Sequence, residues 1–269
     1  MRFELKNEAP WLKIWMLIIM ICLIIVGFKG MFRRNVGDTG AGSPEAPMKI
    51  HAEVPEKVFR RSVEGKKLVA LTFDDGPEVE TTGKLLDILK EKETVATFFE
   101  LGVKVERNSE ITRRAKNEGH EVESHTMYHQ NLVTKTREEA ESDIRAAKEV
   151  FLRVLGEEPK LTRMPYGNSN EFTKAAAGTP LIYWSVDSRD WESKDAEKIQ
   201  EVIFATVKDG AIILMHDIYN TTVDAVPEVI DGLRAEGYEF VTVEELAGLR
   251  GKELQAQETY FSFEATGEI

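Results

Sequence analysis

Two acidic residues stand side by side where an apolar stretch of the sequence ends. Leu68–Phe73 is a continuous apolar run, and Asp74 and Asp75 follow it directly in LTFDDGP. Neighbouring carboxylates repel each other, so the pair needs either solvation or a cation. One explanation is a turn with a helix cap, since Asp-Gly-Pro suits turns and Asp caps helices. The other is a metal, which would bind one carboxylate and leave the other free as a base.

Three of the five histidines also follow apolar segments. His125 and His129 are four residues apart in HTMYH, and His216 ends ILMHD. On a helical turn the first two imidazoles would face the same way, at a spacing suited to one metal ion. Surface or capping histidines are the alternative for this pair. An acid from another strand end would complete a site of two histidines and one carboxylate.

Three further apolar segments end in polar residues. RMPY contains Arg163 and Tyr166, SVDSRDW contains Asp187, Asp190 and Trp191, and Asp217 follows His216. Each has an ordinary explanation, such as a surface arginine, a loop with a packed tryptophan, or a helix cap. Parallel α/β folds, however, place their chemistry at the carboxyl ends of their strands. The coincidence of five such strand ends therefore favours one shared site.

The elements that must position these residues alternate regularly along the chain. Apolar runs of strand length are followed by segments with helical periodicity, which is typical of an α/β fold with a parallel sheet. A barrel and an open sheet both fit this pattern. The seven predicted strands are Leu68–Phe73, Val95–Leu101, Glu121–Ser124, Lys160–Met164, Leu181–Val186, Ala211–Met215 and Glu239–Val243.

The bulk composition narrows the class of protein. The chain has 269 residues, of which 42% are hydrophobic and 30% charged, as in ordinary globular proteins. Its net charge of -12 argues against nucleic acid as a partner, because phosphate binding needs a basic face. The single cysteine, Cys22, excludes an intramolecular disulfide.

An apolar N-terminal segment predicts a membrane location. Ile14–Phe28 carries no charge and, with Trp11 and Leu12, approaches the roughly 17–25 residues that cross a bilayer. A cleaved signal peptide and a retained anchor both fit. Basic and bulky residues follow the segment where a cleavage site needs small ones, which favours a transmembrane helix. We expect a single-pass protein of the cell membrane with its catalytic domain outside the cell.

The chain then divides into four predicted parts. Residues 1–34 form a cytoplasmic stub and membrane anchor, and residues 35–56 form a flexible linker rich in Gly, Ser, Pro and Ala. Residues 57–252 form the α/β domain. Residues 253–269 form a polar, acidic tail that we expect to be peripheral.

The five strand-end motifs together resemble those of the polysaccharide deacetylase family, the NodB-type enzymes of carbohydrate esterase family 4. They stand in the family's order as TFDDGP, HTMYH, RMPY, DSRDW and LMHD, within Lys66–Leu246. The resemblance implies a distorted (β/α)7 barrel, which has fewer strands than the eight of a regular barrel. This agrees with the seven predicted strands.

The resemblance also implies roles for individual residues. Asp74 would be the general base, and Arg163 would hold it in place. Asp75, His125 and His129 would bind a divalent metal ion, usually zinc, although cobalt and nickel accept the same ligands.

The remaining roles concern the substrate and the leaving group. Asp190 would orient His216, the general acid. The backbone N–H of Tyr166 would bind the oxyanion, and Trp191 and Leu214 would wall the slot for the acetyl methyl group. The substrate-binding residues expected in this way are Tyr166, Pro165, Trp191 and Leu214.

The expected function is therefore a metal-dependent hydrolase that removes acetyl groups from N-acetylglucosamine of cell-wall peptidoglycan. Its partners would be an acetylated glycan and, through the N-terminal helix, the membrane. The alternatives are a chitin or chitooligosaccharide deacetylase, an acetylxylan esterase, and a non-catalytic glycan-binding domain. Substrate profiling separates the enzymes, and loss of motif residues would mark the binding domain.

Overall fold

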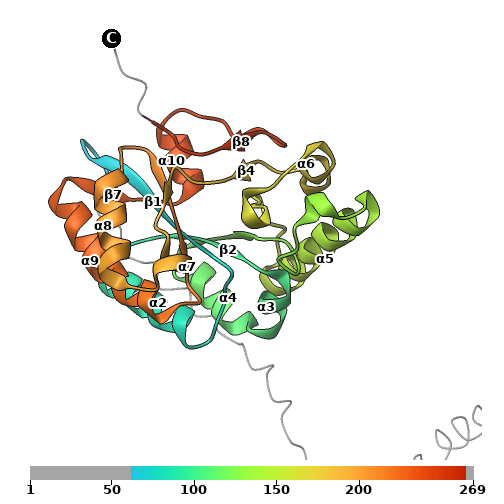
Figure 1. Ribbon diagram of the computed structural model, residues 1–269, viewed down its shortest axis with the longest axis horizontal. Helices are drawn as coiled ribbons and strands as arrows, with labels where there is room; N and C mark the ends of the chain where they lie inside the picture. Colours follow the sequence, from blue (N-terminus) through green and yellow to red (C-terminus); the bar gives the residue numbers. More distant parts are fainter. Residues whose placement is uncertain (1–61, 265–269) are drawn as a thin grey trace, which may run out of the picture. The chain divides into compact units, whose positions relative to one another are not determined.

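A central parallel sheet organises the protein, whose computed structural model describes residues 62–264 (Figure 1). Strand β1 (Lys67–Asp74) lies between β2 (Thr97–Glu100) and β6 (Ala211–His216), and β2 pairs in turn with β3 (Glu121–Ser124). All of these pairings are parallel. From Leu68 onward β1 is buried throughout, as expected of a strand that is covered on both faces.

The backbone pairings close the sheet into a ring. Single parallel bridges join Ser124 to Thr162 and Thr162 to Leu181. Strands β4 (Leu181–Ile182) and β5 (Val186–Asp187) follow one another along the same segment, and β5 pairs with β6. Because β6 pairs with β1, the circuit is complete. Of the two architectures that fit the sequence, the structure is therefore the distorted barrel.

Two predicted strands differ from those observed, and the hydrogen bonds explain why. Lys160–Met164 forms only the bridge at Thr162, because the N–H groups of Lys160 and Leu161 both donate to Oε2 of Glu123, at 2.7 Å each. Leu181–Val186 is interrupted, because its first part pairs beside Thr162 and its end pairs with β6. The last predicted strand appears as β7 (Tyr238–Phe240), which pairs with the beginning of β1.

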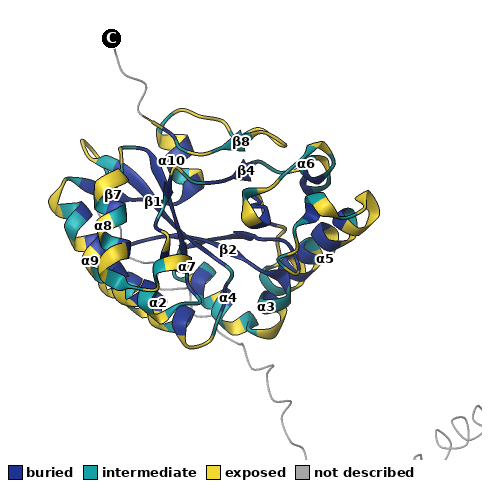
Figure 2. Ribbon diagram, in the orientation of Figure 1, coloured by how far each residue is buried: buried dark blue, intermediate teal, exposed yellow. Residues whose placement is uncertain are grey.

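Helices surround the barrel and turn their apolar faces toward it (Figure 2). Among the described residues the longest helix is α5 (Arg137–Leu155). It begins with a capping box between Thr136 and Glu139 and ends at Gly156, whose φ of 79° glycine tolerates best. The other helices are α2 (Thr81–Glu91), α3 (Gly102–Arg107), α4 (Ser109–Asn117), α6 (Glu171–Ala177), α7 (Asp190–Ser193), α8 (Ala196–Thr206), α9 (Asn220–Ala235) and α10 (Val243–Leu249).

The segment after residue 252, predicted as a peripheral tail, is mostly exposed but adds a strand and one buried side chain to the domain as far as the structure describes it. Strand β8 (Thr259–Tyr260) pairs with β4, and Ser262 bridges Ala211. Phe263 is buried in the apolar cluster that includes Ile212, and its N–H donates to the carbonyl of residue 210. Within this mostly polar segment, Tyr260 and Phe263 of TYFSF pack against the apolar core of the domain.

The predicted anchor and linker, residues 1–34 and 35–56, lie outside the described residues. Within residues 62–264, no helix combines the length and the apolar composition that crossing a membrane requires.

Removing the Phe263 side chain tests whether the C-terminal segment is part of the domain. Phe263→Ala empties a buried site, so the free energy of unfolding of the full-length protein should fall by about 3–5 kcal/mol in urea titrations. Phe261, two residues earlier, is 54% exposed and serves as the control. Phe261→Ala should cost about 1 kcal/mol or less. Equal, small losses of unfolding free energy in both variants would support the original prediction of a peripheral tail.

Candidate active site

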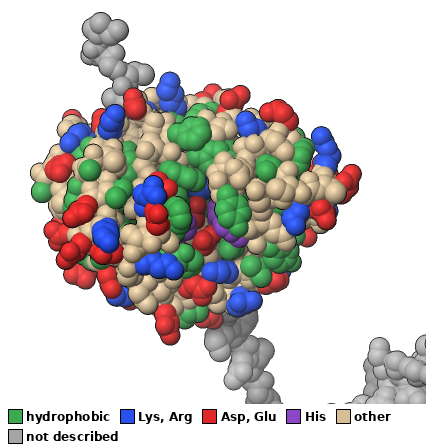
Figure 3. Space-filling model, in the orientation of Figure 1, with side chains coloured by type: hydrophobic (Ala, Val, Ile, Leu, Met, Phe, Trp, Pro, Cys, Tyr) green, Lys and Arg blue, Asp and Glu red, His purple; other side chains and the backbone are tan. Residues whose placement is uncertain are grey.

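Eight of the eleven predicted site residues line one cavity of about 460 Å³ at the carboxyl ends of the strands. Figure 3 shows histidine side chains at the bottom of a hollow that hydrophobic groups flank. The cavity is lined by Asp74, Asp75, His125, His129, Met164, Tyr166, Trp184, Asp187, Trp191, Leu214, His216 and Tyr219.

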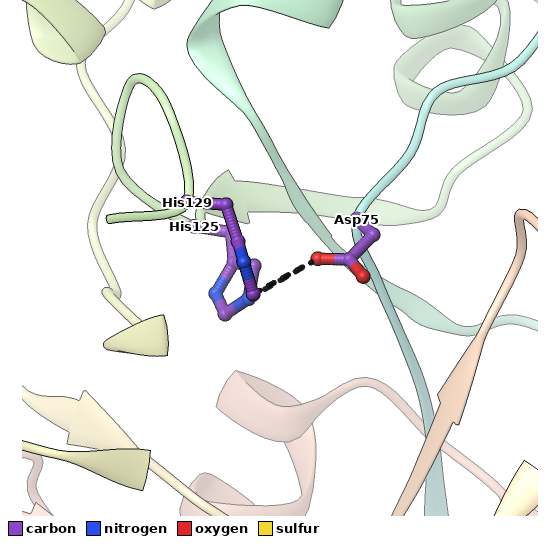
Figure 4. A group of neighbouring side chains, drawn as sticks. All are labelled: Asp75, His125 and His129. Carbon is purple, nitrogen blue, oxygen red and sulfur yellow. Dashed lines mark ion pairs between the residues drawn. The ribbon is translucent and has the colours of Figure 1, made fainter. Parts of the chain in front are cut away.

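Three of these side chains converge in the way a metal site requires (Figure 4). Oδ1 of Asp75 lies 3.5 Å from Nε2 of His125 and 3.3 Å from Nε2 of His129. This oxygen is buried without a hydrogen-bond partner, which a bound cation would supply. The residues therefore fit a divalent ion held by one carboxylate and two imidazoles.

The protonation of His125 also suits a metal ligand. Its Nδ1 lies 2.8 Å from the carbonyl oxygen of Arg163, so Nδ1 carries the hydrogen and Nε2 presents its lone pair to Asp75. Burial lowers the pKa of His125 to about 3, because the effect of burial is larger than the opposing effect of the Asp75 charge. The imidazole is thus neutral at physiological pH.

The backbone that brings the histidines together is a loop, and the predicted helical turn is wrong. Thr126 and His129 have φ angles of 71° and 55°, in the left-handed region. Such conformations persist where the surroundings hold them. Here the N–H of Gly102 donates to the carbonyl of Thr126 at 2.9 Å, and Asp143 accepts from the N–H of Met127 at 2.7 Å. The loop folds back, and the imidazole rings meet 5.0 Å apart.

Arg163 is fully buried beside Asp74, so its interpretation as a surface residue is excluded. It donates to Oδ1 of Asp74 at 2.6 Å and to Oγ1 of Thr72 at 2.8 Å. It also donates to the carbonyls of Ile182 at 2.9 Å and Tyr183 at 3.0 Å. Burial raises the pKa of Asp74, although the Arg163 charge opposes the rise. One oxygen of Asp74 is thereby fixed, while Oδ2 lies 3.8 Å from Nε2 of His125.

Asp190 holds His216 from the other side of the cavity. Oδ1 of this fully buried carboxylate lies 2.8 Å from Nδ1 of His216. Oδ2 accepts from the backbone N–H of His216 at 2.7 Å and from Oγ1 of Thr222 at 2.8 Å. Burial alone would lower the pKa of His216, but the hydrogen bond and charge of Asp190, with the other nearby carboxylates, raise it to about 9. The imidazole is therefore protonated at neutral pH.

The expected substrate-binding residues differ in their exposure and in whether they line the cavity. Tyr166 has a φ of 61° and is 63% exposed, with its ring 4.7 Å from that of His129. Trp191 is half-exposed and Leu214 is buried, and both line the cavity. Pro165 is buried and is not among the lining residues, so its expected substrate contact stays a prediction.

Three lining residues were not expected from the sequence, namely Met164, Trp184 and Tyr219. Each lies within three residues of an expected one or in the segment before Asp187, so proximity to the motifs was their only signal. Asp187 itself was expected at a strand end without a role. Its carboxylate lines the cavity and accepts from the N–H of Arg189 at 2.9 Å.

Comparisons with known proteins identify relatives of this chain. The family described as polysaccharide deacetylase matches residues 61–180. The peptidoglycan-N-acetylglucosamine deacetylase PgdA of Listeria monocytogenes is 39% identical over 195 residues, which are 72% of this chain and 41% of that protein. The peptidoglycan-N-acetylmuramic acid deacetylase PdaC of Bacillus subtilis is 38% identical over 67% of this chain and 39% of its own length. The chain thus spans about two fifths of these two relatives.

Other relatives are matched over nearly their whole length. A peptidoglycan-N-acetylglucosamine deacetylase of Bacillus cereus is 38% identical over 67% of this chain and 88% of its own. Among solved structures, a T48 deacetylase with substrate has a TM-score of 0.70, with 37% identity over 74% of this chain and 99% of that one. A family 4 acetyl xylan esterase from Clostridium thermocellum, in complex with a cobalt ion, has a TM-score of 0.69 and 32% identity over 73% and 98%. The chain belongs to the polysaccharide deacetylase family.

Proposed function

We propose that this protein is a metal-dependent N-deacetylase that removes acetyl groups from N-acetylglucosamine of peptidoglycan. The observation that carries the proposal is the arrangement around one cavity of a carboxylate fixed by Arg163, a group of one carboxylate and two imidazoles, and a protonated His216. The names of the relatives in Listeria monocytogenes and Bacillus cereus support the substrate.

The metal ligands in this proposal are Asp75, His125 and His129. Zinc suits two neutral imidazoles and a carboxylate, and cobalt and nickel accept the same set. A bound divalent cation supplies Lewis-acid polarisation of the carbonyl oxygen and lowers the pKa of water. The unpartnered oxygen of Asp75 and the neutral imidazole of His125 both leave lone pairs available to a metal ion.

The proton transfers are assigned to the two flanking residues. Oδ2 of Asp74 accepts a proton from the attacking water while Arg163 holds Oδ1. The water oxygen bonds to the acetyl carbon, the C–N bond breaks, and Nε2 of His216 gives its proton to the departing amine. Acetic acid, which ionises to acetate at neutral pH, and the free amino sugar result. Asp190 keeps Nδ1 of His216 occupied, so the proton that is delivered comes from Nε2.

The cavity walls accommodate the acetyl group and its oxyanion. Trp191 and Leu214 present apolar surface where the methyl group would lie. Tyr166 has a left-handed backbone conformation, and we assign its backbone N–H to the oxyanion. Loss of one such donor typically costs on the order of 10²–10³ in rate.

Zinc binding tests the ligand assignment without requiring substrate. His129→Ala removes one of three protein ligands. It should therefore lower the Zn²⁺ affinity of the full-length protein by more than the roughly 10–100-fold typical of outer-shell losses. Competition with a chromogenic chelator measures this. Asp187→Asn alters a lining carboxylate outside the ligand set and should leave the affinity unchanged. Equal affinities for the two variants would contradict the assignment.

The reaction itself is tested by acetate release from peptidoglycan and chitin oligomers, with mass spectrometry of the muropeptides. Release should require metal, and Asp74→Asn should lower kcat by roughly 10²–10⁴-fold because the base is lost. Full activity after complete metal removal would refute the mechanism. Mass shifts on N-acetylmuramic acid instead of N-acetylglucosamine, or acetate from xylan alone, would refute the substrate.

The pH profile tests the roles of the two flanking residues. kcat/KM should fall as the pH rises toward 9, where His216 loses its proton, and as the pH falls toward the raised pKa of Asp74. Asp190→Asn removes the charge that favours imidazolium, so the alkaline limb should move down by roughly 1–3 pH units. Glu192→Gln changes an exposed carboxylate nearby and should leave the limb in place. An unmoved limb in Asp190→Asn would remove His216 from the role of acid.

We also propose that residues 14–28 retain the protein in the cell membrane, with the catalytic domain outside. The uncharged composition of the segment and the lack of a small-residue cleavage site after it support this location. After cell fractionation, the full-length protein should stay with membranes when washed with high salt and be released by detergent. Recovery of a shortened chain from the medium would show a cleaved signal peptide instead.

A further inference from the structure

The loop that carries Asp75 is held by hydrogen bonds to Leu101 and to α2, as well as by its own strand, β1. Asp75 itself has a φ of 76°, a left-handed conformation that a non-glycine residue keeps where its surroundings impose it. The carbonyl of Gly76 accepts from the N–H of Leu101 at 3.0 Å. The N–H of Glu78 donates to Oγ1 of Thr82 at 2.8 Å, so the loop is tied to the first turn of α2.

A second buried acid, Asp217, stands behind this loop. It directly follows His216 and is fully buried, and its Oδ2 accepts from Oγ1 of Thr82 at 2.5 Å. A Cβ atom placed on Gly76 would lie 2.3 Å from Oδ2 and 2.6 Å from Oδ1 of Asp217. The carboxylate is thus packed directly against the backbone of Gly76, and Thr82 fastens it there.

We propose that Asp217 is a positioning residue for the metal site. Through its contact with Gly76 and its hydrogen bond to Thr82, it sets the backbone that points Asp75 at the two histidines. It thereby joins the loop of a metal ligand to the strand end that carries His216. The inference rests on the proposed function in one respect, namely that Asp75 binds a metal ion.

A purely structural role for Asp217 predicts different behaviour, because any buried threonine–carboxylate pair contributes to stability. The chain offers a matched pair for comparison. Oγ1 of Thr97 donates to Oε2 of Glu121 at 2.7 Å, also in a buried setting. This pair lies at the beginning of β2 and β3, at the opposite end of the barrel from the cavity. Loss of either hydroxyl should therefore destabilise the fold, but only one loss should reach the metal site.

The test compares Thr82→Val, Thr82→Ser and Thr97→Val in the full-length protein. Thermal unfolding without metal should show similar losses for the two valine variants. Zn²⁺ affinity, measured by chelator competition, should fall about tenfold or more in Thr82→Val, and stay at the wild-type value in Thr97→Val and in Thr82→Ser, which keeps the hydroxyl. The visible absorption of the Co²⁺-loaded protein should change only in Thr82→Val.

Asp217→Asn provides a second variant of the same size. It should weaken Zn²⁺ binding at least as much as Thr82→Val, because it replaces a carboxylate oxygen packed near Gly76 or Thr82 with an NH2 group. Wild-type Zn²⁺ affinity and Co²⁺ spectra in both Thr82→Val and Asp217→Asn would overturn the inference while leaving the proposed function intact. A wild-type protein that binds no Zn²⁺ would instead overturn the metal site, and the inference with it.

Discussion

A buried guanidinium is the constraint on which the active-site arrangement depends. Arg163 has no exposed surface, and a buried charge without partners costs several kcal/mol, so each of its acceptors must stay in place. Those acceptors are Asp74 and Thr72 on β1 and two carbonyls at residues 182 and 183. The ring of Phe99 lies 4.0 Å from the guanidinium carbon. One side chain thus ties β1 to the segment around residues 182 and 183, next to the single bridge between Thr162 and Leu181, and it fixes the base.

The same constraint explains why two acids can be adjacent. Arg163 binds Asp74 inside the barrel, while the left-handed backbone of Asp75 turns the next carboxylate toward His125 and His129. The repulsion between the carboxylates is relieved by two different cations, one a side chain and the other, in our proposal, a metal ion. On the opposite wall, the buried Asp190 and the partly buried His216 form a second acid–base pair. The cavity therefore holds a proton acceptor and a proton donor on either side of the ligand group, as amide hydrolysis needs.

The strand ends could be predicted from sequence because their chemistry is local: an apolar run stops and polar residues of useful types follow. The backbone path could not. HTMYH has helical spacing, but Thr126 and His129 adopt left-handed angles, and the sequence provides no glycine to signal them. The burial of Arg163 depends on carbonyls some 20 residues further along the chain, so the residue type alone left a surface position open as an alternative. The buried part of the C-terminal segment was missed because polar residues dominate the segment, although Phe263 and the pairing of β8 with β4 decide its place.

The central claim is that the adjacent acids have separate tasks, with Asp75 a metal ligand and Asp74 a free base held by Arg163. A crystal structure of the protein with Zn²⁺, using anomalous scattering at the zinc edge, tests it most directly. The account predicts one strong peak within bonding distance of Oδ of Asp75 and Nε2 of both His125 and His129, about 2.0–2.2 Å from each. Asp74 should remain hydrogen-bonded to Arg163 and outside the coordination shell. A zinc ion bound by Asp74, or one placed away from the histidines, would contradict it.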